Sequence, residues 1–390
     1  MMRVLHLGKY YPPVAGGVEY FLADLLGALE RRGVTTAALV HKAGGDPAAD
    51  VPSDNEQPIV HRVPTLGRCL YVPISPTYLY WLNRRIREFR PDLLHLHVPN
   101  VSAFTALLSQ RARVLPWVVH WHADVAMSRV DRRLALAYRF YRPLEQRLLA
   151  KSAAVIATSP PYLQSSDALR RWRERCLTIP LGLDANRHRV SAVHEAPDAE
   201  PIWGRVGLRV LSVGRLTYYK GHDVLIDATG ALPDARTIIV GTGDQASRLR
   251  DLIRERGLQN RVLLWGEAKR VELVALLASC DVFCLPSIER TEAFGLVLLE
   301  AMHFAKPVVV SDIPGSGTGW LVRQAGNGLL TQPGKASSVA DALRQLEQDP
   351  AQRRLLGDKG RTALSVAFSI DAIAKRVADI YARVLGDDAR

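Results

Sequence analysis

The chain has 390 residues, of which 48% are hydrophobic and 23% are charged. This length exceeds what one ordinary hydrophobic core supports, so we expect two globular domains. The composition is that of a folded protein, which excludes intrinsic disorder. The formal net charge of +12 leaves three environments open for the basic surface: nucleic acid, an anionic membrane surface, or only water.

The first half of the chain alternates short apolar runs with amphipathic stretches. The apolar runs have the length of buried parallel strands. They lie at residues 4–7, 35–40, 92–97, 114–120, 153–158 and 177–180. The clearest helix is predicted from Val18 to Arg32, with Gly33 as its C-cap. We interpret the first apolar run as a strand rather than a signal peptide, because it is too short for one.

Arginines crowd this half, and no nucleic-acid-binding motif accompanies them, so we do not expect nucleic acid as a partner. They are Arg84, Arg85, Arg87, Arg90, Arg132, Arg133, Arg139, Arg142, Arg170, Arg171, Arg173 and Arg175. Residues 132–149 mix arginines with large apolar residues such as Phe140. This segment either lies on an anionic membrane surface or is an ordinary amphipathic helix packed on a sheet. No apolar run is long enough for a membrane-spanning helix.

Residues 184–207 lose all periodicity and are expected to form a linker. A second alternating series follows it. Its strands are expected at 208–213, 237–240, 262–264, 281–285, 307–311 and 328–330, and its helices include 223–231, 245–256, 272–278 and 297–304. The sequence therefore predicts an α/β fold of two doubly wound, Rossmann-like domains, at residues 1–190 and 205–368. A last helix, at about 369–390, has no strand after it and is expected to pack back onto the first domain.

The four cysteines show no metal-binding spacing. Cys280 and Cys284 lie on one face of a predicted strand and are expected to be buried thiols. This cysteine usage fits a reducing cytoplasm.

Gly16 and Gly17 stand between the first predicted strand and the first predicted helix. Glycines at this position either let the backbone approach a ligand at a helix N-terminus or only reverse the chain. The surrounding sequence is not Gly-x-Gly-x-x-Gly, which disfavours a dinucleotide-dependent oxidoreductase.

Four histidines fall near the ends of two predicted strands. His95 and His97 share one face of the first strand, and His120 and His122 share one face of the next. Such a group can bind a metal, but only Asp124 adds a carboxylate, and we predict no metal site. We select His122 because it is nearest the predicted ligand crevice and regard the other histidines as structural.

In the second half, Arg215 and Lys220 follow a predicted strand within a loop bounded by glycines. Two fixed cations at this position can neutralise a diphosphate; the alternative is that both are solvated surface charges. Gly241 opens a further glycine turn after the next strand. That turn either lies close to a nucleotide or only joins a strand to a helix.

The stretch from Glu292 to Glu300 places two carboxylates on either side of a Phe294-Gly295 turn and a helix start. Backbone N–H groups at a helix start favour phosphate. Eight residues span at most about 12 Å along an ideal helix, so one carboxylate can reach a sugar and the other a ribose across a diphosphate. The absence of Asp-x-Asp and of Gly-x-x-x-x-Gly-Lys-[Ser/Thr] disfavours a manganese-dependent sugar transferase and a P-loop enzyme.

With these motifs in place, the chain resembles the retaining glycosyltransferases of family 4, which have the GT-B fold. The resemblance covers nearly the whole chain, through segments 16–17, 120–124, 180–184, 214–221, 292–300 and 327–330. It implies two facing Rossmann-like domains, a nucleotide-sugar donor in the cleft between them, and no required metal or other cofactor.

The resemblance also implies roles for the second-domain residues. By this likeness Arg215 and Lys220 hold the diphosphate, and Glu300 binds the ribose hydroxyls. Glu292, together with the backbone of Phe294 and Gly295, binds the donor sugar and phosphate.

From the first domain, Gly16 and Gly17 are implied to close over the donor, and His122 to contact the transferred sugar. Residues 313–322 look like the Gly-Thr-Gly turn of bacterial mannosyl- and rhamnosyltransferases of polysaccharide and O-antigen synthesis, although Pro-Gly-Ser-Gly replaces the simpler form. This likeness favours GDP-mannose as the donor and leaves UDP-sugars open.

We therefore expect a metal-independent hexosyltransferase that extends a polyprenyl-diphosphate-linked saccharide. We expect it to be cytoplasmic and peripheral on the inner membrane. The alternatives are a nucleotide-sugar epimerase of the same fold and a non-catalytic, membrane-docked subunit that binds sugar nucleotides. A binding-only subunit could lose some of Arg215, Lys220, Glu292 and Glu300, and all four are present.

Overall fold

The computed structural model describes residues 1–43, 58–69, 72–125, 132–188, 202–204 and 206–386, without the side chains of 68–69, 132–135 and 188. These residues form two compact units, one of Met1–Gly182 with Ile370–Arg390 and one of Leu183–Ser369. Leu183 pairs with Ser369 in an isolated parallel bridge, and both residues belong to the second unit. Most of the predicted linker lies outside the described residues.

The first unit is built on a seven-stranded sheet in which all neighbouring strands are parallel. Its order is β3-β2-β1-β6-β7-β8-β9. The strands are β1 (Arg3–Leu7), β2 (Thr35–His41), β3 (Ile59–Val63), β6 (Leu93–Val98), β7 (Trp117–Trp121), β8 (Ala154–Ala157) and β9 (Cys176–Thr178). Sequence analysis missed β3, because His61 and Arg62 interrupt its apolar run, as an edge strand permits.

Sequence analysis also missed a short antiparallel hairpin of β4 (Gly67–Cys69) and β5 (Val72–Ile74). The main helices of this unit are α1 (Gly17–Glu30), α2 (Tyr78–Phe89), α4 (Arg132–Lys151) and α14 (Ile370–Leu385). The shorter ones are η2 (Val101–Leu107), α3 (Gln110–Arg113), α5 (Pro160–Ser165) and η3 (Arg170–Arg175).

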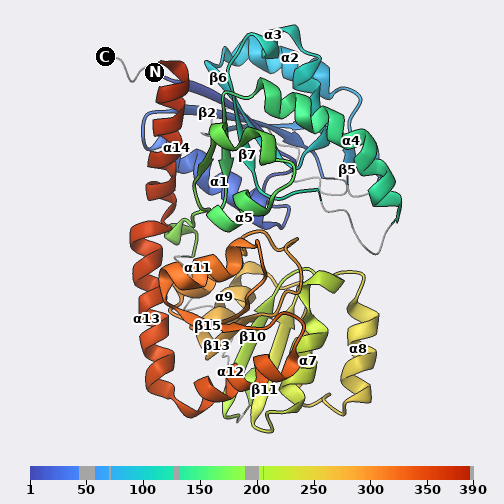
Figure 1. Ribbon diagram of the computed structural model, residues 1–390, viewed down its shortest axis with the longest axis vertical. Helices are drawn as coiled ribbons and strands as arrows, with labels where there is room; N and C mark the ends of the chain where they lie inside the picture. The colour runs from blue at the N-terminus through green and yellow to red at the C-terminus, as the bar shows by residue number, and fades with distance from the viewer. Residues whose placement is uncertain (44–57, 70–71, 126–131, 189–201, 205, 387–390) are drawn as a thin grey trace. The chain divides into compact units, whose positions relative to one another are not determined.

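The C-terminal helix α14 lies beside α1 within the first unit (Figure 1). Ile373, Val377 and Tyr381 are buried along one face of α14. At the end of α1, Arg31 forms an ion pair with Asp371 at 2.9 Å. The returning helix is therefore part of the core of the first unit. Among the described residues, no helix is both long and apolar enough to cross a bilayer.

The second unit contains a six-stranded parallel sheet in the order β12-β11-β10-β13-β14-β15. Its strands are β10 (Leu208–Val213), β11 (Ala235–Val240), β12 (Val262–Gly266), β13 (Val282–Leu285), β14 (Val308–Ser311) and β15 (Gly328–Thr331). Each lies where the apolar pattern predicts a strand. Cys280 and Cys284 are buried and free, as predicted.

Several helices of the second unit share a core with this sheet. The helices of this unit include η4 (Ala185–His188), η6 (Tyr218–Lys220), α7 (His222–Gly230), α8 (Ala246–Glu255), α9 (Arg270–Ser279), α10 (Val297–His303), α11 (Gly317–Ala325), α12 (Ala336–Gln348) and α13 (Pro350–Ala367). All four helices predicted for this region are present.

Both sheets share one topological feature that positions a ligand site. When strands are numbered within each unit, the order is 3-2-1-4-5-6, and the first unit adds a seventh strand at the edge. The direction of winding reverses between β1 and β6 in the first unit and between β10 and β13 in the second. In open parallel sheets, ligands bind beyond the carboxyl ends of the strands at this reversal.

Candidate functional site

In the second unit, the loops that follow β10 and β13 meet at the reversal point. Lys220, at the end of the first loop, donates to Oε2 of Glu292, in the second loop, at 2.5 Å. Ser287 donates a second hydrogen bond to the same oxygen at 3.0 Å. The structure thus brings together a cation and a carboxylate that lie far apart in the sequence, and it adds Ser287, which sequence analysis missed.

The Lys220–Glu292 ion pair is largely withdrawn from water, with side-chain exposures of 12% and 10%. Burial alone lowers the pKa of Lys220, but the negative charge of Glu292 opposes burial and the net pKa lies above its ordinary value. Lys220 is therefore cationic at neutral pH. A buried ion pair contributes little net stability, because desolvation offsets the attraction, whereas loss of one partner leaves a costly unpaired charge.

Glycines allow the backbones of these loops to touch. Gly241 has φ 143°, and a Cβ there would lie 2.0 Å from the carbonyl oxygen of Gly214. Gly221 has φ 64°, and a Cβ there would lie 2.2 Å from the carbonyl oxygen of Pro286. The Gly241 turn thus packs on the backbone of the Lys220 loop. A larger residue at Gly241 or Gly221 would therefore clash with the facing carbonyl oxygen.

Arg215 follows β10 after Gly214 and is exposed. In the part of the chain that the structure describes, no carboxylate forms an ion pair with Arg215. Its positive charge lies near enough to lower the pKa of Lys220 slightly, as the smallest of the contributions to that pKa. The structure therefore places Arg215 near the ion pair but outside it.

The segment between Glu292 and Glu300 forms a tight turn followed by α10. Phe294 is buried, and Gly295 has φ 76°, which a larger residue adopts only with strain. Glu300 lies within α10 and pairs with Arg187 of η4, at 3.5 Å between Oε1 and Nη2. Sequence analysis missed Arg187. In the sequence, the only feature that points to Arg187 is its position just after segment 180–184.

The segment at 313–322 supports the Glu292 turn from behind. The Ser316 hydroxyl donates to the carbonyl oxygen of Glu292 at 2.5 Å. The same hydroxyl accepts from the backbone N–H of Thr318 and so caps α11. The N–H of Gly317 donates to the carbonyl of Ala293 at 2.8 Å. The start of α11 and the Glu292 turn are thus one hydrogen-bonded unit.

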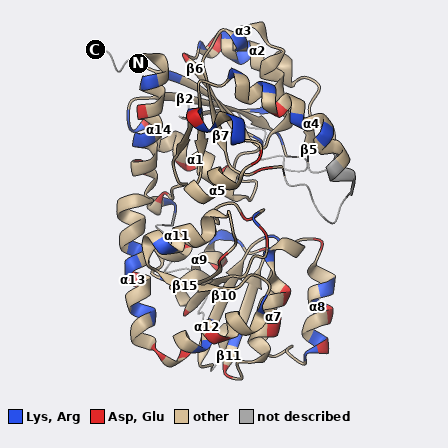
Figure 2. Cartoon of the chain, viewed as in Figure 1, with Lys and Arg blue, Asp and Glu red and all other residues tan. Residues whose placement is uncertain are grey.

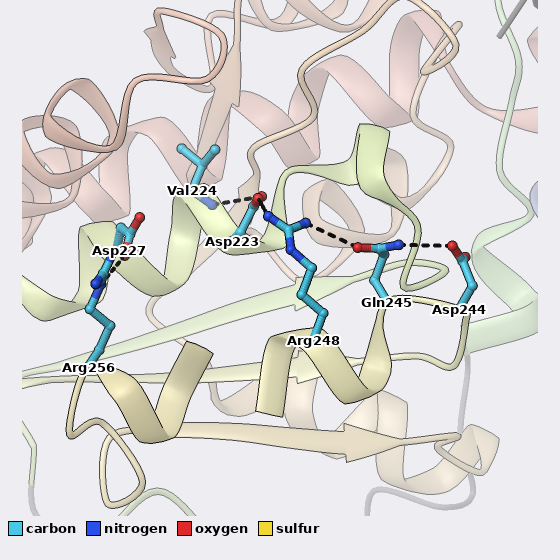
Figure 3. Close-up of polar contacts among 7 residues, drawn as sticks. All are labelled: Asp223, Val224, Asp227, Asp244, Gln245, Arg248 and Arg256. Atoms are coloured by element: carbon cyan, nitrogen blue, oxygen red, sulfur yellow. Dashed lines mark hydrogen bonds and ion pairs between the residues drawn. The ribbon is translucent and has the colours of Figure 1, made fainter. Parts of the chain in front are cut away.

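A polar ladder begins at Asp244 and runs from α8 to α7 (Figure 3). Asp244 accepts from Gln245, Gln245 accepts from Arg248, and Arg248 pairs with Asp223 of α7 at 3.2 Å. These side chains are mostly exposed, so each contact is worth roughly 0–1 kcal/mol. The ladder therefore joins α7 to α8 at the end of the loop that follows β11.

In the first unit, Gly16 is the residue before α1, and Gly17 begins the helix. Gly16 has an extended backbone with φ 169°, so its conformation does not require glycine. A Cβ at Gly16 would instead lie 2.1 Å from Oε2 of Glu19. Gly17 is exposed. The structure thus places the two glycines at a helix start, beside a carboxylate.

His122 follows β7 and belongs to a stack of five buried imidazoles, not four. The fifth is His6 of β1, a lone histidine in a strand that gave no functional signal in the sequence. Nδ1 of His97 and Nε2 of His122 are 2.9 Å apart, and Nδ1 of His6 and Nε2 of His97 are 3.1 Å apart. The remaining two, His95 and His120, stack on the others with ring centroids 4.4–5.4 Å apart.

The imidazole stack is held electrically neutral. Burial lowers the pKa of His6 and of His122 to about 3. Burial, reinforced by the neighbouring imidazoles, lowers the pKa values of His95, His97 and His120 well below the ordinary value. None of these rings is therefore an imidazolium at neutral pH.

Two triplets in the stack bring ring nitrogens within 4.8 Å of one another, His6-His95-His97 and His97-His120-His122. Both include His97, whose two nitrogens already contact His6 and His122. In the second triplet the ring planes differ by only 1–14°. In the observed arrangement both nitrogens of His97 are therefore engaged by neighbouring imidazoles.

Asp124 is a structural residue of the first unit. One carboxylate oxygen accepts from Trp121 at 2.8 Å and from Ser166 at 2.7 Å. The N–H of Asp124 donates to the hydroxyl of Tyr162 at 2.6 Å. These bonds fix the loop that carries His122.

Helix α4 presents large apolar side chains to solvent at four-residue spacing. Leu136, Phe140 and Leu144 are 62%, 73% and 37% exposed. Arg139, Arg142 and Arg147 are exposed on the same helix, and its basic residues are blue in Figure 2. The opposite face packs inward through Glu145 and Leu148. The side chains of Arg132 and Arg133 lie outside the described residues.

Comparisons with known proteins agree with both units. The family model "Glycosyl transferase 4-like domain" matches residues 16–182, and "Glycosyl transferases group 1" matches residues 207–363. The D-rhamnosyltransferase WbpZ of Pseudomonas aeruginosa is 30% identical, over 91% of this chain and 89% of that protein. The O-antigen chain mannosyltransferase C of Escherichia coli is 28% identical, over 98% of this chain and 99% of that protein.

Among solved structures, the sucrose-phosphate synthase of Thermosynechococcus elongatus is similar in fold, with a TM-score of 0.79. It is 23% identical, over 99% of this chain and all of that one. The predicted GT-B class, with two Rossmann-like sheets, is confirmed. The chain therefore belongs to the retaining glycosyltransferases of family 4 and is a hexosyltransferase.

Proposed function

We propose that this enzyme transfers mannose from GDP-mannose, with retention of anomeric configuration, to a polyprenyl-diphosphate-linked saccharide of a bacterial surface polysaccharide. The observation that carries the proposal is the buried Lys220–Glu292 ion pair at the strand reversal of the second unit. It supports the proposal because ligands of such sheets bind at the strand reversal, so a diphosphate bound there would face a fixed cation.

In this proposal the diphosphate displaces Glu292 from Lys220. Lys220 then faces phosphate oxygens, with Arg215 as a second cation, and Glu292 becomes available to a sugar hydroxyl. As the bond between the sugar and the phosphate breaks, negative charge grows on the leaving diphosphate, and fixed cations stabilise it. The protein contributes position and charge stabilisation, and no further cofactor takes part.

Retention follows if the acceptor hydroxyl attacks from the side of the leaving group. The oxygen of the acceptor forms the new bond to the anomeric carbon as the bond to the diphosphate breaks. The proton of the acceptor hydroxyl passes to the departing phosphate oxygen. Glu300, oriented by Arg187, would bind the ribose hydroxyls of the donor, and His122 would contact the transferred sugar.

The mannose assignment is supported by two observations. Residues 313–322 resemble the Gly-Thr-Gly turn of bacterial mannosyl- and rhamnosyltransferases, and they are hydrogen-bonded to the Glu292 turn. In addition, a full-length relative is named as an O-antigen chain mannosyltransferase. The likeness of residues 313–322 also favours GDP over UDP as the nucleotide, whereas the name of the relative concerns only the sugar.

A donor and acceptor panel tests this proposal. GDP-mannose, GDP-rhamnose, UDP-glucose and UDP-galactose are each incubated with polyprenyl-diphosphate-linked saccharides, and released nucleotide, extended lipid and the anomer formed are measured. We expect extended lipid with an α-linked mannose from GDP-mannose. Faster transfer from a UDP-sugar would contradict the donor assignment. An epimerised free donor, or binding without turnover, would contradict hexose transfer.

We also propose that α4 docks on an anionic membrane surface. Its exposed Leu136, Phe140 and Leu144 can enter the interface between headgroups and acyl chains, while its arginines pair with lipid phosphates. This binding would hold the enzyme beside a lipid-linked acceptor.

Sedimentation with vesicles tests α4 docking. Wild-type protein is expected to sediment with phosphatidylglycerol-containing vesicles and not with pure phosphatidylcholine vesicles. Phe140→Glu should weaken sedimentation, whereas Val366→Glu should not; both residues are 73% exposed, and Val366 lies in the second unit. Equal losses in the two variants would contradict docking through α4.

A further inference from the structure

Three of the buried imidazoles form a hydrogen-bonded chain across three neighbouring strands. It begins at His6 on β1, passes through His97 on β6 and ends at His122, just after β7. The end nitrogens, Nε2 of His6 and Nδ1 of His122, are buried and have no hydrogen-bond partner among the described residues. The chain thus connects the core of the first unit to the residue proposed to contact the sugar.

Each ring in this chain carries one N–H, because each is neutral. His97 contacts a neighbour through both nitrogens, so it must donate from one and accept at the other. The direction of either hydrogen bond therefore fixes the direction of the other. The chain has two states, and its three tautomers change together.

In one state, Nε2–H of His122 donates to His97, and Nε2–H of His97 donates to His6. This state leaves Nε2–H of His6 as a buried donor with no acceptor. In the other state, Nδ1–H of His6 donates to His97, and Nδ1–H of His97 donates to His122. The unpaired donor is then Nδ1–H of His122.

The second state is favoured by burial and by the effect of a ligand. His6 is 0% exposed and His122 is 4% exposed as whole residues, so His122 is the less deeply buried end of the chain, although both end nitrogens are themselves buried. Unpaired buried N–H groups are rarer in proteins than unpaired acceptors, because their desolvation is costly. A ligand oxygen at His122 would satisfy that donor, whereas no group in the described part of the chain can satisfy one at His6.

We propose that His6 and His97 fix His122 as its Nδ1–H tautomer, and that this N–H donates to a hydroxyl oxygen of the donor sugar. The tautomer assignment rests on the structure of the first unit alone, and the contact with the sugar rests on the proposed function. His97 and His6 act here as positioning residues, since they reach the sugar only through His122.

The tautomers can be measured without any donor or acceptor. In protein labelled with ¹⁵N-histidine, long-range ¹⁵N–¹H correlations distinguish Nδ1–H from Nε2–H, and single substitutions assign the signals. We expect Nδ1–H at His6, His97 and His122. His97→Phe removes both links and should convert His122 to Nε2–H or to a mixture. His6→Phe breaks the chain at its far end and should also produce a mixture, which covers the case in which His97→Phe does not fold.

The matched control is His120→Phe. His120 lies 4.4 Å from His122 between ring centroids and is 0% exposed, but neither of its ring nitrogens has a hydrogen-bond partner among the described residues. Its replacement should leave the tautomer of His122 unchanged. With donor and acceptor, His97→Phe should lower kcat/KM about tenfold, the loss expected for one hydrogen bond at the reacting sugar. His120→Phe should stay within about twofold, and His97→Gln, whose amide can both donate and accept, should recover part of the loss.

Each outcome of these measurements either supports or overturns one part of the proposal. An Nε2–H tautomer at His122 in the wild-type protein, or an Nδ1–H tautomer that survives both His97→Phe and His6→Phe, overturns the proposal. The expected tautomers with an unchanged kcat/KM in His97→Phe overturn the contact with the sugar. The expected tautomers in a protein that transfers no hexose support the tautomer assignment and contradict the proposed function instead.

Discussion

The two units use the same strand order and place polar residues at the same reversal point, but the chemistry differs. In the second unit, Lys220 and Glu292 are charged and opposite in sign. In the first unit, the corresponding edge carries imidazoles that burial keeps neutral. The difference supports the proposal that the second unit binds the charged diphosphate and that the first unit contacts neutral hydroxyls.

The largest effect is expected when the charge of Lys220 is removed. Lys220→Met should lower kcat/KM by about 10²–10³-fold, because charge on the leaving diphosphate loses its fixed cation. Steady-state kinetics with GDP-mannose measures this loss. Lys306→Met is the control, since Lys306 also lies in the second unit but donates to the carbonyl of Ala278. Similar losses in both variants would remove the assigned role of Lys220.

The next largest effect concerns the contact that holds the charged loops together. Gly241→Ala should destabilise the protein by about 3 kcal/mol, because the new Cβ would meet the carbonyl oxygen of Gly214. Denaturant unfolding measures this change. Gly257→Ala is the control: Gly257 has φ 64° with nothing within 4 Å of its Cβ position, so only backbone strain of about 1 kcal/mol is expected. Equal costs would show that the close contact is absent.

A third prediction tests whether the first unit keeps its polar groups uncharged. Glu145 of α4 is buried beside Tyr138, and burial raises its pKa from 4.5 to about 7. Because the folded-state pKa is the higher one, the stabilising contribution is complete below pH 4.5 and is lost as pH rises to about 7. Glu145→Gln has no such loss. As the pH rises from 4.5 to about 7, its free energy of unfolding should therefore increase by about 2–3 kcal/mol relative to that of the wild type.

Unfolding of both proteins across this pH range measures that gain. Tyr138→Phe removes the hydrogen bond that favours ionised Glu145 and should steepen the pH dependence of the otherwise wild-type protein. A parallel response of wild type and Glu145→Gln would show that Glu145 titrates normally.

The smallest effect is expected at Arg187, which pairs with Glu300 rather than forming part of the central ion pair. Arg187→Ala should weaken GDP binding by about threefold to tenfold, the loss expected for one oriented carboxylate. Calorimetry with GDP and 2′,3′-dideoxy-GDP measures it. The loss should nearly vanish for the dideoxy nucleotide, because it lacks the hydroxyls that Glu300 would bind. An equal loss for both would assign Arg187 to another part of the nucleotide.

The sequence predicted the second unit better than the first. The six strands of the second unit's sheet contain apolar runs that the pattern detects, and β13 and β14 are buried along their whole length. In the first unit, β3 was missed because it is an edge strand that contains His61 and Arg62. The hairpin of β4 and β5 is too short to show an apolar period.

The candidate site was predictable where residues follow strands and unpredictable where the fold joins distant segments. Lys220 and Glu292 were each selected from their loops, but their ion pair depends on β10 and β13 being neighbours in the sheet. Ser287 and Arg187 gave no pattern of their own. His6 joins the imidazole stack only because β1 lies beside β6. The proposed roles of Gly16, Gly17 and His122 toward the donor remain predictions.

The most direct test of the central claim measures nucleotide binding to the second-unit ion pair. GDP and guanosine are titrated calorimetrically into wild type, Lys220→Met and Lys306→Met. The account predicts that Lys220→Met weakens GDP binding at least about tenfold and changes guanosine binding by less than about twofold, because only GDP carries the diphosphate. Lys306→Met should bind both like wild type. Equal effects of Lys220→Met on GDP and guanosine, or no effect on GDP, would contradict the account.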